Sequence, residues 1–262
     1  MARTGADRRG RYNAAIRDRT SPVAAGPVTQ LVLDLGAPPE PTFDNFVPGD
    51  NLEALAAARA LSAGAAPTRF LYLWGPASSG RTHLLRALAA AEPRRAARLL
   101  GPRSPEPAFV HAPEVGLWLI DDVHALDRER QAAAFHLFEA VLGTGGARLA
   151  AAGARPPARL ATMPELATRL GWGLVLRLRR LSDADVERAL IATLAERGVT
   201  ASADLVPWLM THAPRDLGRL RALVDRLDRH ALALKRAITL PLVREYLQSR
   251  APGRDGADGD LA

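Results

Sequence analysis

The chain has 262 residues, no cysteine and a formal net charge of +7. This length suffices for one or two domains with a buried core. Without cysteine, disulfides and thiolate metal sites are excluded, and the six histidines fall at no metal-ligand spacing. No apolar run approaches the ~20 residues of a membrane span, and no signal-peptide pattern opens the chain. We therefore expect a soluble, cytoplasmic protein with no membrane partner.

Much of the positive charge lies at the N-terminus. In residues 1–29, six arginines oppose two aspartates, a net charge of +4 in a segment rich in Gly, Ala and Pro. We predict a disordered basic tail there, and a second disordered tail over the Gly- and Asp-rich residues 251–262. The remaining sequence is nearly balanced in charge, which argues against an intrinsic DNA-binding surface.

An alternating apolar hexapeptide, Gln30–Leu35, follows the tail and leads into a Pro-rich linker that ends at Pro41. The pattern alone favours a short edge strand by a small margin. An extended peptide that docks in a groove of another protein is the alternative.

Two further local patterns precede and follow the central motif. Asn51 is placed to cap an alanine-rich helix that runs to about Leu61. Between Pro93 and Pro113 the prolines leave only weak strand signals, near Ala97–Leu100 and Phe109–Val110.

The stretch that organises the chain is an apolar strand, Phe70–Trp74, followed by a turn-rich loop and a helical pattern. The loop has the spacing Gly-x-x-x-x-Gly-Arg-Thr, which is that of a phosphate-binding loop with its lysine replaced by arginine. Backbone N–H groups and the start of the helix would face the phosphates. A strand-to-helix turn without a ligand is the alternative. The candidate nucleotide-binding residues are Gly75, Ser78, Ser79, Gly80, Arg81 and Thr82.

A second apolar strand, Gly116–Ile120, ends in Asp121 and Asp122. Two carboxylates at this point form a Walker-B arrangement, in which Asp121 and Thr82 would hold Mg²⁺ and its water shell. Asp122 would then be placed to orient a water molecule for attack. The alternative is that Asp122 is only a helix N-cap.

The rest of the chain alternates helices and strands and then changes to helices alone. We predict a parallel sheet covered by helices over residues 42–180, and an all-helical domain over 181–250. Ser182 and Asp185 form a capping-box pattern at the start of that second domain. Its predicted core includes the apolar residues Leu217, Leu220, Leu223, Val224 and Leu227.

This order of domains resembles the AAA+ architecture, and several motifs resemble the bacterial replication initiator DnaA and, most of all, its shortened homologue, the regulatory inactivator Hda. The resemblance spans roughly residues 30–249. It is carried by Thr42-Phe43-x-x-Phe46-x-Pro48-Gly49-x-Asn51, Tyr72–Gly75, Gly80–Leu85, Arg155–Pro157, Leu166–Leu170 and Ile238–Pro241.

The resemblance implies an AAA+ P-loop domain with a parallel sheet and a small helical lid, holding ADP or ATP with Mg²⁺. It implies a negative regulator of replication initiation that docks on the DNA polymerase sliding clamp and stimulates hydrolysis of ATP bound to the initiator. DNA would be reached only through the clamp, and a homo-oligomer is left open. The chain would not itself be an enzyme, since its own ATP turnover is expected to be weak.

Individual roles follow from motif position. The resemblance makes Arg169 an arginine finger acting in trans and Arg215 the sensor-2 residue, and it places Phe46 and Val47 near the adenine base. It turns the hexapeptide into a clamp-binding peptide with contacts from Gln30, Leu31, Leu33 and Leu35.

Two residues depart from the family pattern, since Arg81 replaces a lysine and Ala154 stands where an aspartate is usual. Both make self-hydrolysis doubtful. The main rival is an autonomous ATPase acting on DNA, such as a helicase loader or a truncated initiator. A structural AAA+ relic without nucleotide is a third reading. For Arg169, the alternative is an ion pair with a nearby acid such as Glu165.

Overall fold

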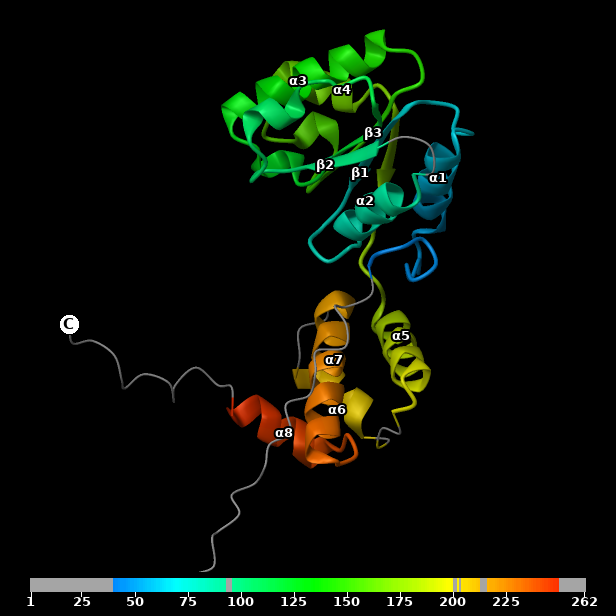
Figure 1. Cartoon of the computed structure of the whole chain (residues 1–262), viewed down its shortest axis with the longest axis vertical. Coiled ribbons are helices and arrows are strands. Elements are labelled where there is room, and N and C mark those ends of the chain that lie inside the picture. The colour runs from blue at the N-terminus through cyan, green and yellow to red at the C-terminus, as the bar shows by residue number, and fades with distance from the viewer. Residues whose placement is uncertain (1–39, 93–95, 200–201, 203, 213–215, 250–262) are drawn as a thin grey trace, which may run out of the picture.

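A computed structural model of the protein describes residues 40–92, 96–199, 202, 204–212 and 216–249. An α/β domain lies at one end of the molecule and a group of helices at the other (Figure 1). The hexapeptide at 30–35, both predicted tails and Arg215 lie outside the described residues.

A parallel sheet of five strands forms the centre of the α/β domain, in the order β2-β3-β4-β1-β5. β3 is buried along its whole length, as expected for a strand covered on both faces. The central strand β1 pairs with β4 on one side and β5 on the other. The strands are β1 (Phe70–Trp74), β2 (Ala96–Leu100), β3 (Val115–Ile120), β4 (Arg148–Gly153) and β5 (Leu174–Arg177).

Helices cover both faces of this sheet (Figure 1). On one face, α1 (Leu52–Ala63) and α2 (Arg81–Ala90) pack against Leu71 and Leu73 of β1. On the other, α3 (Arg128–Gly143) and α4 (Pro164–Leu170) pack against Phe70 and Tyr72. The two sets alternate along β1 because successive side chains of a strand point to opposite faces.

The helical domain consists of α5 (Asp183–Glu196), α6 (Leu205–His212), α7 (Leu217–Leu234) and α8 (Leu240–Ser249). Ser182 and Asp185 form the predicted capping box at the start of α5. Of the five predicted core residues on α7, four are buried and Leu217 is only partly buried. The predicted fold class, a parallel α/β domain followed by an all-helical lid, is confirmed.

Two local predictions are wrong, the strand near Phe109 and the side-chain cap of α1 by Asn51. The weak strand signal at Phe109–Val110 is instead a short 3₁₀ helix, η1 (Glu106–Phe109), because Pro105 and Pro107 have no N–H to donate to a sheet. Two further 3₁₀ turns are η2 (Val123–Ala125) and η3 (Pro157–Arg159).

Asn51 stands at the N-cap of α1, but its side chain makes no capping hydrogen bond. Its amide group instead donates to the Arg179 carbonyl (3.0 Å) and accepts from the Arg179 N–H (2.7 Å). Asn51 thus ties the entry of the α/β domain to the segment that leads into the lid. Within the described part of the chain, no helix is both long and apolar enough to cross a bilayer.

Candidate functional site

The loop between β1 and α2 lies at the carboxyl edge of the sheet, where parallel α/β folds bind their ligands. Gly80 has a φ of +91°, and a Cβ atom there would lie 2.7 Å from the Phe46 ring. A Cβ atom on Gly75 would collide with the Leu178 carbonyl. Both positions therefore require glycine, and the loop they permit leads directly into the N-terminus of α2.

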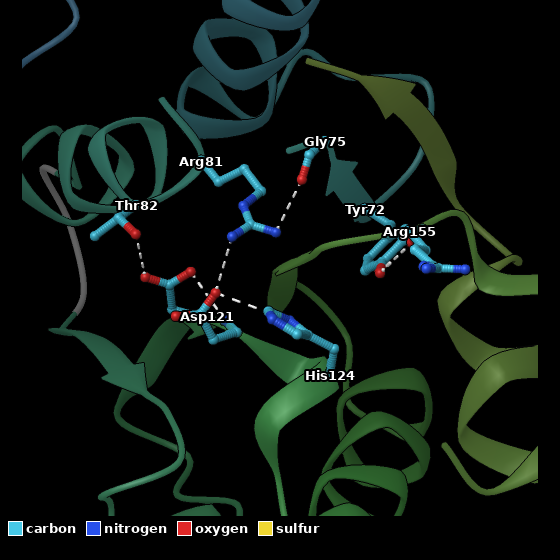
Figure 2. Close-up of polar contacts among 8 residues, drawn as sticks. Tyr72, Gly75, Arg81, Thr82, Asp121, His124 and Arg155 are labelled. Carbon is cyan, nitrogen blue, oxygen red and sulfur yellow. Dashed lines mark hydrogen bonds and ion pairs between the residues drawn. The ribbon is translucent and has the colours of Figure 1, made fainter. Parts of the chain in front are cut away.

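Arg81 is engaged inside this loop (Figure 2). Its guanidinium donates to the Gly75 carbonyl (3.0 Å) and to Asp122 Oδ1 (3.1 Å), and its side chain is only 11% exposed. Asp122 has a φ of 48° and makes no side-chain cap on the turn that follows, so the N-cap alternative is wrong. The carboxylate that would orient water is thus paired with the loop's own arginine.

Thr82 and Asp121 meet beside this ion pair (Figure 2). The Thr82 hydroxyl donates to Asp121 Oδ2 (2.6 Å), and Asp121 Oδ1 accepts from the Asp122 N–H (2.9 Å). A hydroxyl and carboxylates are the hard oxygen ligands that Mg²⁺ prefers. The donor set therefore fits a magnesium ion held through Thr82 and Asp121.

A cavity of about 360 Å³ lies between the loop and the lid. The side chain of Ser79 lines it, and the Ser79 hydroxyl is buried with no hydrogen-bond partner among the described residues. This hydroxyl is therefore free to form a hydrogen bond with a ligand in the cavity. The cavity is lined by Pro41, Asn45, Phe46, Val47, Ser78–His83, Arg86, Leu181, Asp216, Leu217, Gly218 and Arg221.

Flat rings form part of the cavity wall. The ring centroids of Phe46 and His83 lie 5.3 Å apart. His83 Nε2 lies 2.9 Å from the Thr42 carbonyl oxygen, and because a carbonyl can only accept, Nε2 is the donor. Burial lowers the pKa of His83 below its ordinary 6.5, so the imidazole is neutral near pH 7. Val47 lies on the same wall. This wall suits a planar aromatic base.

The lid contributes two charged groups to the cavity. Asp216 accepts a hydrogen bond from Ser78, whose φ is 61°. Burial raises the pKa of Asp216, but the Ser78 hydroxyl and nearby N–H donors outweigh it, so the pKa lies below the usual range. Arg221 donates to the Asn45 carbonyl (3.2 Å), and burial lowers its pKa. Hydrogen bonds thus connect the lid both to Ser78 of the loop and to Asn45, which precedes Phe46 in the base-side wall formed by Phe46, Val47 and His83.

Sequence reasoning missed His83, Asp216 and Arg221 as cavity residues. His83 was visible as the neighbour of Thr82 within the loop motif. The only signal for Asp216 was its position beside Arg215. No sequence signal pointed to Arg221, because it lies on α7, whose hydrophobic periodicity indicates only which residues face the core.

Arg169 lies elsewhere, at the end of α4, and does not line the cavity. Its Nε forms an ion pair with Glu139 of α3, so the predicted ion pair with a nearby acid is present, although the partner is Glu139 and not Glu165. Its guanidinium also lies over the Trp172 ring, 3.8 Å from the centroid, and 5.3 Å from that of Phe135. The structure therefore brings the loop, Asp121 and Asp122 together and leaves Arg169 on a separate surface.

The lid matches a known family. Residues 183–247 match the family model described as the Hda lid domain. This match covers α5 to α7 and most of α8.

Solved structures are similar over most of the chain. Domain III of the Thermotoga maritima replication initiation protein DnaA has a TM-score of 0.68 and 21% identity, covering 83% of this chain and all of that one. AMPPCP-bound DnaA from Aquifex aeolicus has a TM-score of 0.59 and 17% identity, covering 73% of this chain and 65% of that one. The Thermotoga maritima RuvB branch migration motor has a TM-score of 0.60 and 14% identity, covering 83% of this chain and 74% of that one.

At these identities the structural likeness establishes the fold. The chain has the fold of DnaA domain III, and residues 183–247 match the Hda lid domain, so the predicted resemblance is confirmed for the fold and for the lid. The chain spans 65% of the length of the Aquifex aeolicus DnaA chain.

Proposed function

We propose that this protein is a nucleotide-bound regulator of chromosomal replication that switches off a DnaA-type initiator by stimulating hydrolysis of the initiator's ATP. The observation that carries the proposal is the match of the lid to the Hda family, on a chain whose fold is that of DnaA domain III.

The cavity supports binding of ADP or ATP with Mg²⁺. The buried, unpartnered Ser79 hydroxyl, the start of α2 and the Thr82–Asp121 pair offer groups for phosphates and a cation. Phe46 and His83 offer a wall for the base. The DnaA of Aquifex aeolicus was solved with AMPPCP, which favours an adenine nucleotide here too.

The ion pair between Arg81 and Asp122 supports weak turnover by the protein itself. The guanidinium, 3.1 Å from Asp122 Oδ1, occupies a position at the carboxylate where an attacking water would otherwise donate its hydrogen bond. Ala154 offers no polar group at the end of β4, where the family usually has aspartate. The nucleotide would then serve to hold the lid and the α/β domain together.

Stimulation of the partner would come from Arg169, acting in trans as an arginine finger. Arg169 does not line the chain's own cavity, which agrees with a role at a nucleotide bound by the partner. A fixed positive charge on a partner's phosphate stabilises the charge that develops in the transition state. Docking on the sliding clamp would reside in the peptide Gln30–Leu35, which keeps DNA contact indirect.

The deciding experiment measures hydrolysis of radiolabelled ATP bound to the initiator, with and without this protein, on sliding clamp loaded on DNA. We expect stimulation by the wild type and a loss of about 10³-fold or more for Arg169→Ala. Arg98→Ala is the matched control, because Arg98 also lies over an aromatic ring, 5.2 Å from Trp118, and is remote from Arg169 on β2. Arg98→Ala should keep full stimulation.

Three outcomes distinguish the proposal from its rivals. Retained stimulation by Arg169→Ala at an unchanged melting temperature would end the finger assignment. Rapid, DNA-stimulated ATP hydrolysis by this protein alone would favour an autonomous ATPase. Failure to bind any nucleotide would favour a structural relic.

A further inference from the structure

Arg169 contacts three residues of its own chain, of which Glu139 and Trp172 are the nearer and Phe135 has its ring centroid 5.3 Å from the guanidinium carbon. Glu139, on the adjacent helix α3, contacts Nε of the guanidinium. Trp172 lies against its face, with the guanidinium carbon 3.8 Å from the ring centroid. Among the described residues, no hydrogen bond or ion pair engages the two terminal Nη atoms of Arg169.

The two terminal nitrogens therefore have no hydrogen-bond partner among the described residues, on a side chain that is 21% exposed. The two terminal nitrogens form the planar fork that binds phosphate oxygens. The Nε edge and one face, which are not needed for that contact, are the parts already engaged. An arginine side chain loses much rotamer freedom when it is fixed, and here part of that loss is already incurred before any partner arrives.

The position of Trp172 is itself fixed by the backbone. The Trp172 N–H donates to the Arg169 carbonyl (3.1 Å), and the next residue, Gly173, passes so close to the Phe70 carbonyl that a Cβ atom would collide with it. Yet Trp172 is 50% exposed as a residue, which is unusual for a tryptophan that serves only the core.

We propose that Glu139 and Trp172 are positioning residues for Arg169, which hold its guanidinium with the terminal nitrogens presented to a phosphate on the partner. The inference rests on the proposed function. It adds that the finger is pre-organised in the unbound protein by one carboxylate and one aromatic face. A merely structural ion pair would instead contribute to folding and leave the partner's reaction rate unchanged.

The test uses the initiator assay above and varies initiator concentration to separate the maximal rate from half-saturation. Glu139→Leu and Trp172→Ala should each lower the maximal stimulated rate about tenfold, because each removes one contact that fixes the guanidinium. The half-saturating concentration should change less than about twofold. Glu139→Gln keeps an acceptor for Nε and Trp172→Phe keeps an aromatic face, so both should retain most of the rate.

Two controls separate positioning from folding. Glu129→Gln removes an exposed carboxylate from the first turn of the same helix and should leave the rate unchanged. In an Arg169→Ala background, Glu139→Leu and Trp172→Ala should lower the residual rate no further, because they act through the arginine.

The outcomes identify which idea fails. If Arg169→Ala abolishes stimulation but Glu139→Leu and Trp172→Ala keep the wild-type maximal rate, positioning is refuted and the finger stands. A higher rate for Glu139→Leu also refutes it, since the carboxylate would then restrain the finger. If Arg169→Ala keeps stimulation, the finger assignment fails, and the positioning role of Glu139 and Trp172 fails with it. If the wild type gives no stimulation, the proposed function itself is refuted.

Discussion

Substitution of Gly80 tests the phosphate loop most directly. An L-residue in the left-handed region costs about 1–2 kcal/mol, and the φ of Gly80 is +91°. A methyl group there also meets the Phe46 ring at 2.7 Å, well inside the 3.4 Å at which ordinary contact begins. The ring belongs to the base-side wall of the cavity, so its displacement reaches the ligand as well as the fold.

Gly64 provides the matched control. Its φ is +70°, but a Cβ atom there meets nothing within 4 Å, and it lies at the end of α1. Gly64→Ala and Gly80→Ala should each lower the melting temperature by about 2–8 °C, from 1–2 kcal/mol of backbone strain. Only Gly80→Ala should weaken ADP binding, by about tenfold or more, and Gly80→Val should abolish it.

Isothermal titration calorimetry with ADP and Mg²⁺, beside thermal melting of the same preparations, measures both effects. Full-strength ADP binding by the Gly80→Val protein would refute the phosphate-loop assignment. Equal loss of binding in Gly64→Ala would show that strain anywhere in the domain is enough, and the local argument would fail.

Four further predictions concern the loop arginine, Asp122, the peptide and a histidine. Arg81→Ala should weaken ADP binding without abolishing it, because backbone N–H groups provide most contacts, and calorimetry on the same series measures this. ATP turnover by the wild type should be slow, and Asp122→Asn should change it little. A wild-type turnover at an ordinary enzymatic rate that is lost in Asp122→Asn would contradict the regulator proposal. Joint replacement of Gln30 and Leu33 by alanine should release the protein from immobilised clamp, and undiminished retention would exclude the peptide as the docking element. The folded-state pKa of His83 lies below 6.5, so on acidification the unfolded chain protonates this imidazole before the folded protein does, and stability falls as the pH drops below about 6.5. His83→Gln keeps a hydrogen-bond donor but does not titrate, so its melting temperature should fall less than that of the wild type between pH 7.5 and 5.5. Identical pH profiles for the two proteins would rule out this role of His83.

The sequence alone was sufficient for the fold class and for the existence of most elements. The apolar runs at β1 and β3, the glycines around the loop and the capping box at Ser182 are local signals, because each depends on residues a few positions apart. Periodicity and motif spacing therefore located the strand-loop-helix unit of the predicted phosphate loop, the two acids that follow β3 and the helical domain. Periodicity failed at η1, where prolines exclude the strand that apolar residues suggest.

Only the tertiary structure decided which side chains meet. Arg81 and Asp122 are 41 positions apart, Asn51 and Arg179 are 128 apart, and Arg169 reaches Glu139 over 30 positions rather than Glu165 on its own helix. Such pairs depend on the order of strands in the sheet and on the angle at which helices cross it, and no local pattern encodes either. The sequence therefore determined that a nucleotide-type loop exists, and the packing of distant segments decided that its arginine is paired and where the candidate finger points.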